Sequence, residues 1–451
     1  MRLYSLFVKY VLYPAWMIKD GNYGQLKYIK KYQNLNNLPS NKILQSQHNK
    51  LQEVLSHAYD NTGYYRKLFD QYNLNPSDNN FIESFKKLPF LTKKIVKESF
   101  DELVATNIPK ADLLLASTGG STGSPMKFYR DKECLYKRKG QELFYDRWYG
   151  YDLGKKAALF VAASHYDDVI NKVKAYIRNE TCERLLRFDP YNITDEFMEE
   201  FLKEFNRYAP EVIKSFPNSL YVFAEFIKRK GLHVNKVKSI TCTGENLYES
   251  QKELFKEVFD ADVYEKYGTK ECGIIASECT AHDGMHIFSE GVYVEILNES
   301  GEDVSPGEMG HLVITDLMNK GMPLIRYKIG DMAIAAGDAS CRCGVRLPKI
   351  KKILGRDRDI ILDSNGNPKP GYLFVEAVNE LELDAQFQIV QTSRDNLTVK
   401  VVSEDKDMDL SKLTQKYKKY LGEGVSIEYR FVDELSRDPS GKYRYVISEL
   451  N

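Results

Sequence analysis

The feature that most constrains the fold of this chain is a regular alternation of short apolar runs and amphipathic segments, which begins near residue 111. The runs LLLAST, AALFVAA and VKSITCT have the length and composition of strands, whereas ESQKELFKEVF has the spacing of an amphipathic helix. Strands that alternate with helices favour a largely parallel sheet with helices on both of its faces. The sequence therefore predicts a large α/β domain with parallel or mixed sheets.

The regions on either side of this alternation have different patterns. Residues 1 to about 110 predict helices with charged faces, for example at 45–59 and 80–85. From about residue 287, Glu-Ser-Gly and Ser-Pro-Gly turn signals lie between alternating strands. The sequence therefore predicts a helical N-terminal part and a β-hairpin subdomain within the large domain.

The charged segment GRDRD at 355–359 is followed by a compact module of fewer than a hundred residues. Its pattern predicts a hairpin, helices near 371–381 and 409–420, and the strands QFQIV, LTVKVV and SIEYRFV. We therefore predict an N-terminal domain over residues 1–354, a hinge at 355–359 and a small, mobile α+β C-terminal domain over residues 360–451.

Charge and cysteine content exclude some classes of function. The chain has 64 Lys and Arg against 64 Asp and Glu, so its formal net charge is zero and a nucleic-acid partner is not expected. Seven cysteines spread over 451 residues do not form the framework of a secreted disulfide-rich protein. They favour a reducing compartment, and we predict a cytoplasmic protein.

The N-terminal segment MRLYSLFVKYVLYPAW is apolar but is interrupted by Lys9 and closed by Pro14. The run is too short to span a bilayer, and no cleavage site of a signal peptide follows it. A short amphipathic helix is the better prediction. Packing on the protein's own surface is the favoured interpretation of its apolar residues, and peripheral contact with a membrane is the alternative.

The segment that is most informative about chemistry is STGGSTGSP at 117–125. Three glycines and five hydroxyl residues on a loop between two strands can direct several backbone N–H groups toward one point, which suits a phosphate group. No Gly-Lys-Ser/Thr opens a helix here, so the segment is not a Walker loop. A solvated Ser/Gly loop is the alternative.

Four later segments are weaker signals when each is taken alone. In YEKYGTKECG at 264–273, Glu271 could hold Mg²⁺ through a carboxylate oxygen. In IRYKIGD, Asp331 could accept both hydroxyls of a ribose, and GRDRD follows at 355–359. In PSGKYR, Lys442 lies on an exposed turn near the C-terminus. Solvated side chains are the alternative in each case.

The order of these five segments resembles that of the core motifs of the adenylate-forming superfamily, which includes acyl-CoA synthetases, luciferases and peptide-synthetase adenylation domains. The resemblance runs from about residue 111 to 445, and five motifs in order are more specific than any one of them. The length and the segment SHAYDNTGYYRKLF at 56–69 are most similar to the phenylacetate-CoA ligase branch and its CapK-like capsular-polysaccharide members.

The resemblance implies a role for each matching residue. Glu271 would ligate Mg²⁺, Asp331 would hold the ribose, Arg356 would approach it, and Lys442 would neutralise charge on the α-phosphate and the carboxylate during adenylation. The other implied ATP or AMP contacts are Ser117, Thr118, Gly119, Gly120, Ser121, Thr122 and Gly123 around the β- and γ-phosphates, Gly244 and Glu245 beside the adenine, and Tyr267, Gly268 and Thr269 along the adenine and acyl sites.

The chain departs from the superfamily pattern at two positions. Ser124 stands where many relatives have a lysine before the proline, and Lys270 replaces the hydroxyl residue that usually precedes the glutamate. Both departures concern phosphate contacts, and Lys270 could supply charge instead. The acid-binding pocket is expected to draw on residues 215–221 and 241–247.

A structural zinc site is a further expectation. Cys341-Arg-Cys343 has the tight spacing of a zinc turn, and Cys279 lies upstream with His282 and His286. Similar cysteine positions occur in phenylacetate-CoA ligase-like relatives, and the resemblance favours His286 as the fourth ligand. The alternative is a buried Cys279 and two free thiols.

The resemblance implies an enzyme that uses ATP and Mg²⁺ to convert a carboxylic acid into its acyl-adenylate and then transfers the acyl group to an acceptor. Coenzyme A is the default acceptor. One alternative is an amine or hydroxyl in surface-polysaccharide biosynthesis, as expected of a CapK-like ligase. A second alternative, from a different class, is a non-catalytic interaction module of polysaccharide assembly. An oligomer is possible in either case.

Overall fold

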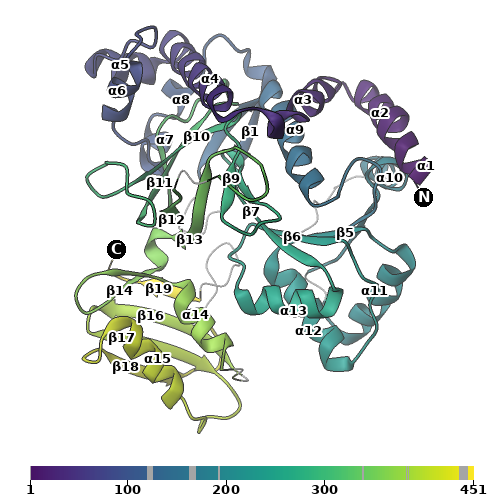
Figure 1. Cartoon of the computed structure of the whole chain (residues 1–451), viewed down its shortest axis with the longest axis vertical. Helices are drawn as coiled ribbons and strands as arrows, with labels where there is room; N and C mark the ends of the chain where they lie inside the picture. Colours follow the sequence, from purple (N-terminus) through teal and green to yellow (C-terminus); the bar gives the residue numbers. More distant parts are fainter. Residues whose placement is uncertain are drawn as a thin grey trace.

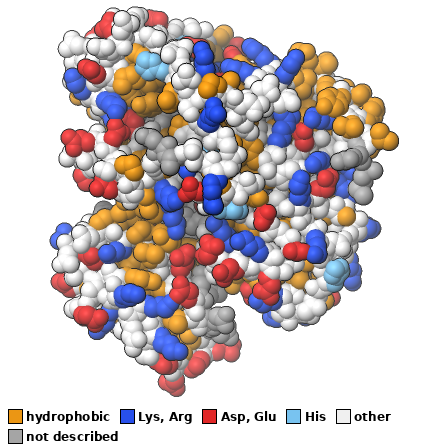
Figure 2. Space-filling model, viewed as in Figure 1, with side chains coloured by type: hydrophobic (Ala, Val, Ile, Leu, Met, Phe, Trp, Pro, Cys, Tyr) orange, Lys and Arg blue, Asp and Glu red, His pale blue; other side chains and the backbone are white. Residues whose placement is uncertain are grey.

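The computed structural model describes residues 2–118, 125–161, 169–190, 193–337, 340–381, 383, 385–435 and 445–450. The large domain fills most of the view in Figure 1, and the C-terminal domain lies at the bottom. On the face shown in Figure 2, basic and acidic side chains are interspersed, which agrees with the zero net charge.

The first part of the chain is helical, as the sequence predicts. Its elements are α1 (Arg2–Phe7), the π-helical turn η1 (Val8–Leu12), α2 (Tyr13–Lys19), α3 (Gly24–Tyr32), η2 (Leu35–Asn37), α4 (Ser40–Asn61), α5 (Gly63–Gln71), α6 (Phe81–Lys87), α7 (Lys93–Glu98), α8 (Phe100–Leu103) and η3 (Lys110–Asp112). Apolar side chains from α4 to α8, such as Leu55, Phe69 and Phe85, are buried against the sheet of the large domain. None of the helices in the described ranges is long and apolar enough to cross a membrane.

The large domain is built on an 11-stranded sheet in the order β10-β11-β12-β13-β9-β8-β7-β6-β5-β3-β4. The strands β3 to β7 are parallel, and the rest pair antiparallel, which confirms the predicted α/β domain with a mixed sheet. The strands are β3 (Ala157–Phe160), β4 (Leu185–Arg187), β5 (Val212–Ser215), β6 (Ser239–Thr243), β7 (Asp262–Thr269), β8 (Gly273–Glu278), β9 (Met285–Ile287), β10 (Val292–Leu297), β11 (Met309–Asp316), β12 (Tyr327–Ala335) and β13 (Lys349–Arg356).

One predicted strand lies outside this sheet. The run LLLAS forms β1 (Leu113–Ser117), which pairs antiparallel with β2 (Lys127–Asp131) in a separate two-stranded sheet. The expectation that this run joins the parallel sheet is therefore wrong, because its partner is the strand that follows the Ser/Gly segment. The two strands hold the ends of that segment next to each other.

Helices pack on the sheet and complete its core. They are α9 (Lys132–Trp148), α10 (Val169–Arg178) with the turn η4 (Asn179–Glu183), α11 (Asp195–Tyr208), α12 (Pro217–Lys230) and α13 (Glu249–Phe259). Phenylalanines from α11, α12 and α13 interlock around β3 to β7, for example Phe205, Phe223 and Phe259. Burial of this apolar cluster fixes the parallel strands, and thus the edge at which they end.

The C-terminal domain begins after β13 and has a core of its own. Its elements are η5 (Asp357–Asp359), β14 (Ile360–Leu362), β15 (Pro368–Pro370), α14 (Tyr372–Asn379), β16 (Gln386–Ser393), β17 (Asn396–Val402), α15 (Ser411–Leu421), β18 (Ser426–Phe431) and β19 (Val446–Ser448). A four-stranded sheet in the order β18-β17-β16-β19 packs on both helices. η5 covers residues 357–359 of the segment predicted as a hinge, and the division of the chain at 355–359 stays a prediction.

Candidate functional site

Three predicted residues meet where β7, β12 and β13 lie close to the hinge. Tyr267 donates its hydroxyl to Asp331 Oδ2 at 2.5 Å, and Arg356 Nε lies 3.1 Å from Asp331 Oδ1. Asp331 and Arg356 face each other across the β12–β13 ladder. The Asp331 side chain is buried, so this carboxylate is held in one orientation between a neutral donor and a cation.

The electrostatics of this cluster follow from burial and from the carboxylate. Burial raises the pKa of Tyr267 well above its usual value, and Asp331 raises it further, so the phenol stays protonated and donates. Asp331 also raises the pKa of Arg356, which keeps the guanidinium charged. A carboxylate has about four lone-pair positions, so Asp331 can still accept hydroxyl groups of a ligand.

Glu271 lies in the turn between β7 and β8 and is buried. The Tyr327 hydroxyl donates to Glu271 Oε1 at 3.4 Å and also lies 3.7 Å from the sulfur of Met126. Met126 in turn pairs with Thr118: the Thr118 N–H donates to the Met126 carbonyl at 2.9 Å, and the Met126 N–H donates to Thr118 Oγ1 at 3.0 Å. Glu271 therefore lies beside the base of the predicted phosphate loop.

Much of the predicted phosphate loop falls outside the described residues. Ser117 ends β1 and Thr118 follows it, whereas Gly119, Gly120, Ser121, Thr122 and Gly123 lie outside the described ranges. Lys442 also lies outside them. The roles assigned to these residues stay predictions from the resemblance.

The segments predicted to form the acid pocket come together at the ends of β5 and β6. Ser215 Oγ lies 3.3 Å from the sulfur of the fully buried Cys242, and Glu245 Oε2 accepts from the Asn218 N–H at 3.3 Å. Gly244 has a φ of +82°, and a Cβ there would lie 2.7 Å from the Phe216 ring. The close approach of these two segments requires glycine at this position.

Two further predicted residues shape the β7–β8 turn. A Cβ at Gly268 would lie 2.5 Å from the Gly273 carbonyl oxygen, so the antiparallel pairing leaves no room for a side chain. Thr269 Oγ1 accepts from the Cys272 N–H at 3.1 Å, which closes the turn that carries Glu271. In this structure Thr269 therefore positions the backbone around Glu271.

Helix α9 contributes residues that the sequence did not reveal. Arg138 donates to the Lys270 carbonyl at 3.2 Å and to the Glu271 carbonyl, and its guanidinium pairs with the fully buried Asp316 at 2.9 Å. Two turns later, Asp146 forms ion pairs with Lys214 of β5 and Lys266 of β7. α9 therefore fixes both the turn of Glu271 and the two strands that flank β6.

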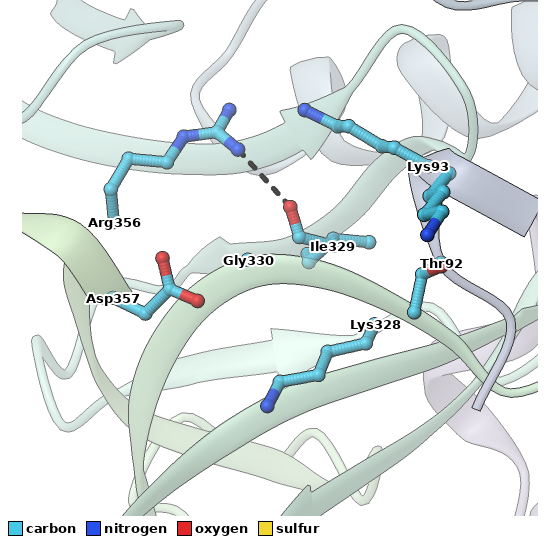
Figure 3. Close-up of a pocket in the computed structure, with 8 residues that line it drawn as sticks. Thr92, Lys93, Lys328, Ile329, Gly330, Arg356 and Asp357 are labelled. Atoms are coloured by element: carbon cyan, nitrogen blue, oxygen red, sulfur yellow. Dashed lines mark hydrogen bonds between the residues drawn. The ribbon is translucent and has the colours of Figure 1, made fainter. Parts of the chain in front are cut away.

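A basic pocket of about 300 Å³ lies next to the hinge (Figure 3). It is lined by Thr92, Lys93, Lys94, Lys328, Ile329, Gly330, Arg356 and Asp357. Arg356 spans the pocket and the Asp331 cluster, since its Nη1 donates to the Ile329 carbonyl at 3.1 Å. Four cations against one carboxylate give the pocket a positive potential. Sequence patterns did not predict this pocket, because α7 and β12 are more than 200 residues apart.

The four residues of the predicted metal site converge. The ligand atoms of Cys279, His286, Cys341 and Cys343 all lie within 4.8 Å of one another. The sulfurs of Cys279 and Cys341 are 3.6 Å apart, and His286 Nε2 lies 3.3 Å from the Cys343 sulfur. Two sulfurs bound tetrahedrally to zinc at about 2.3 Å would be about 3.8 Å apart, so the residues fit this ion.

The surroundings select His286 over His282. His286 Nδ1 lies 3.0 Å from the Leu347 carbonyl, so the hydrogen of the neutral ring sits on Nδ1 and the Nε2 lone pair faces the thiols. His282 instead pairs with Glu278 at 3.1 Å and stacks on the Tyr264 ring. The arrangement of a closed Cys₃His site therefore contains His286, as the sequence favoured.

Comparison with known proteins agrees with this geometry. The family model of the CapK C-terminal domain matches residues 372–449. Protein CapK of Staphylococcus aureus is 22% identical over 91% of this chain and 90% of its own length. The phenylacetate-coenzyme A ligase of Pseudomonas putida is 22% identical over 88% of this chain and 92% of its own length.

A solved structure of similar fold is that of 2-hydroxyisobutyryl-CoA ligase in its postadenylation state, with an acyl-AMP bound. It superposes with a TM-score of 0.72 at 18% identity and covers 92% of each chain. The same enzyme in its thioesterification state gives a TM-score of 0.59. The fold, the family model and the full-length relatives together identify the chain as an adenylate-forming protein similar to CapK and to the phenylacetate-CoA ligases.

Proposed function

We propose that this protein is an ATP-dependent ligase that activates a carboxylic acid as its acyl-adenylate. The observation that carries the proposal is the convergence of Tyr267, Asp331 and Arg356 at the hinge, with Glu271 beside the base of the 117–125 loop. A carboxylate that can accept hydroxyl groups and a second, metal-compatible carboxylate beside Met126, at the base of the candidate phosphate loop, support the proposal. Such a set suits a nucleotide triphosphate.

In the proposed reaction a substrate carboxylate oxygen attacks the α-phosphate of ATP in line, the bond to the β-phosphate breaks, and pyrophosphate leaves with the electron pair. Asp331 would accept the ribose hydroxyls, and Glu271 would hold Mg²⁺, which would offset phosphate charge. Lys442 approaches from the C-terminal domain to stabilise charge on the α-phosphate. The acid lies between residues 215–221 and 241–247.

The acyl group then passes to an acceptor, and the mixed anhydride loses AMP. A rotation of the C-terminal domain about η5 would change its contacts with the large domain between the adenylation step and the acyl-transfer step. The higher TM-score against the postadenylation state, 0.72 compared with 0.59, supports an arrangement near that of adenylation.

The basic pocket supports an acceptor that carries phosphate groups. The pocket contains Lys93, Lys94 and Lys328 next to Arg356. An anionic acceptor bound there would touch Arg356, which belongs to the predicted hinge. Coenzyme A fits this requirement and is our first choice. An amine or hydroxyl of a surface-polysaccharide precursor is the alternative, which the similarity to CapK supports.

The experiment that tests adenylation is pyrophosphate release with hydroxylamine as a substitute acceptor, over a panel of aromatic, fatty, hydroxy and amino acids. We expect release with one acid class, and an Asp331→Asn variant with a raised KM for ATP. No release with any acid, together with no shift of the melting temperature by ATP and Mg²⁺, would leave the non-catalytic interaction module as the better description.

The experiment for the acceptor uses the acid identified in this way. Coenzyme A should yield a thioester, and dephospho-coenzyme A and pantetheine should show a stepwise higher KM as phosphates are lost. The variant Lys328→Gln should raise the KM for coenzyme A. It should not change the rate of pyrophosphate release when hydroxylamine is the acceptor. An equal KM for all three thiols would contradict a phosphate site in the pocket.

We also propose that Cys279, His286, Cys341 and Cys343 hold a structural zinc ion. The closed donor set leaves no position for substrate, so the ion would fasten the loop at 341–343 to β8 and β9. Metal analysis of the purified protein should find about one zinc per chain. A cytoplasmic location is part of the proposal, and the seven cysteines, which form no disulfide, support it.

A further inference from the structure

The first helical elements form one continuous rod with two different faces. α1, η1 and α2 run from Arg2 to Lys19, a length of about 27 Å at 1.5 Å per residue. One face is buried on the large domain through Val8, Tyr13 and Met17. Lys9 pairs with Asp152 at 2.7 Å and anchors the rod there. Packing on the protein's own surface thus accounts for one face of the predicted amphipathic helix.

The opposite face of the rod is apolar and exposed. Its exposed fractions run from 47% at Phe7 to 84% at Leu3. The residues are spaced by three, four or seven positions, as expected for one side of a helix: Leu3, Leu6, Phe7, Tyr10, Val11 and Ile18. We call this set the N-terminal stripe. It is the reverse of the usual surface helix, whose solvent face is polar.

A second helix extends the N-terminal stripe. On α10, Val173, Tyr176 and Ile177 are 52%, 68% and 46% exposed. α10 and η4 lie next to the rod, since the Tyr4 hydroxyl donates to the Thr181 carbonyl at 3.3 Å and Arg178 pairs with Asp20 at 3.3 Å. Apolar side chains gather over this corner of the molecule in Figure 2, at the upper right. A patch of this kind marks an interaction surface.

The net charge around the patch indicates which kind of partner binds to it. Residues 1–32 contain six Lys or Arg and one Asp, a net charge of +5, although the whole chain is neutral. Lys19, Lys27, Lys30 and Lys31 are all exposed, on α2, which carries part of the N-terminal stripe, and on α3, which follows it in the chain. A second copy of this chain would bring the same positive charge against itself. An anionic surface would be attracted by it.

Two exposed tyrosines of the patch also favour an anionic lipid surface as the partner. Tyr10 and Tyr176 are 66% and 68% exposed and carry an apolar ring with a polar end. Such side chains suit the boundary between headgroups and acyl chains, where helices with an apolar face and flanking lysines lie parallel to the membrane. The rod is also too short to cross a bilayer, which needs about 20 apolar residues.

We propose that this protein docks on anionic lipid surfaces through the N-terminal stripe and the exposed residues of α10, with the lysines of α2 and α3 at the headgroups. The C-terminal domain lies at the opposite corner of the molecule (Figure 1), so the docked protein keeps its hinge clear of the membrane. The proposal does not depend on the ligase activity.

The test is co-sedimentation of the full chain with vesicles of phosphatidylcholine, with and without 30% phosphatidylglycerol. We expect binding to the anionic vesicles that weakens at high salt. Phe7→Glu/Val11→Glu should reduce the bound fraction at least tenfold, and Lys27→Glu/Lys30→Glu should reduce it for anionic vesicles. Ile193→Glu, at an exposed apolar residue before α11, is the matched control and should bind as wild type.

Two results would overturn the proposal. One is wild-type protein that stays in the supernatant with both kinds of vesicle. The other is a wild-type dimer in light scattering that Phe7→Glu/Val11→Glu converts to a monomer without any change in vesicle binding, since the second copy would then be the occupant. The melting temperatures of the variants, measured alongside, should equal that of wild type and would show that they are folded.

Discussion

Two clusters of this molecule are built in the same way but differ in what they can do. The hinge cluster of Tyr267, Asp331 and Arg356 and the thiol cluster around His286 both join segments distant in the chain. The thiol cluster is closed, because four donors complete a tetrahedral shell. The hinge cluster keeps acceptor capacity on Asp331 and lies between two domains. If the proposed roles hold, one cluster serves activity and the other stability.

The comparison can be tested first at the residue with the largest expected effect. Lys442→Ala should reduce acyl-adenylate formation by roughly 10²–10³-fold, because a preorganised charge is lost where negative charge develops. The melting temperature and the ATP affinity should stay near those of wild type. Pyrophosphate release measures the effect, and Lys418→Ala on α15 of the same domain is the control. An unchanged rate would remove Lys442 from the reaction.

The thiol cluster should give the opposite result. Cys341→Ser should lose zinc and lower the free energy of unfolding by about 3 kcal/mol or more, because metal binding contributes to folding. Once folded at low temperature, the variant should retain its KM for ATP. Zinc content and denaturant unfolding are the measurements. His282→Asn is the matched control, since His282 has a φ of +50° that asparagine tolerates. Full zinc content in Cys341→Ser would contradict the assigned ligand set.

A smaller effect is expected within the hinge cluster itself. Asp331→Asn keeps the shape but removes the charge that pairs with Arg356, and hydrogen bonds to a charged group contribute about 1.5–3 kcal/mol. We therefore expect a KM for ATP that is roughly 10- to 100-fold higher, with little loss of stability. Steady-state kinetics against ATP measures it. A variant that unfolds instead would place Asp331 with the structural residues.

The stability contributed by the residues between the hinge cluster and the thiol cluster should depend on pH. Glu265 lies on β7, and its N–H donates at 3.0 Å to Glu278, which precedes Cys279. Burial raises the pKa of Glu265 to about 7. Because the folded state holds this proton more tightly than the unfolded state, the stability from this group is complete below pH about 4.5 and is lost as pH rises through 7.

Glu265→Gln removes that dependence. The variant should match wild type near pH 5 and be more stable by about 2 kcal/mol near pH 8, measured by denaturant unfolding at both values. Gln388, a buried residue of the C-terminal domain, offers a contrast: Gln388→Glu should lose stability as pH rises. A constant difference between Glu265→Gln and wild type over this range would show that Glu265 is ionised in the folded protein.

The sequence predicted the parts of this molecule that depend on local pattern. Alternating apolar runs and amphipathic segments led to the mixed sheet, and the motif order led to the similarity to CapK and the phenylacetate-CoA ligases. The thiol cluster could be predicted because cysteine spacing is itself a local signal, and His286 could be preferred over His282. The roles assigned to the residues of the 117–125 loop and to Lys442 stay predictions.

The sequence failed where tertiary contacts decide the role of a residue. Arg138 is one of many basic residues on a helix, and only the packing of α9 shows that it holds the carbonyl of Glu271. Tyr327 lies in the IRYKIGD segment, but nothing in that pattern shows that its hydroxyl contacts both Glu271 and Met126. Lys93 and Lys328 form one pocket only because α7 lies against β12. No periodicity in a single sequence encodes such contacts.

Helix α9 has a consequence for how such a chain can change in length. Arg138 and Asp146 are just over two helical turns apart, and each is tied to a different part of the sheet. One inserted residue between them would rotate one side chain by about 100° relative to the other and break one set of contacts. This stretch of α9 can therefore be substituted but not lengthened, so its length should be the same in natural or engineered variants that keep both sets of contacts.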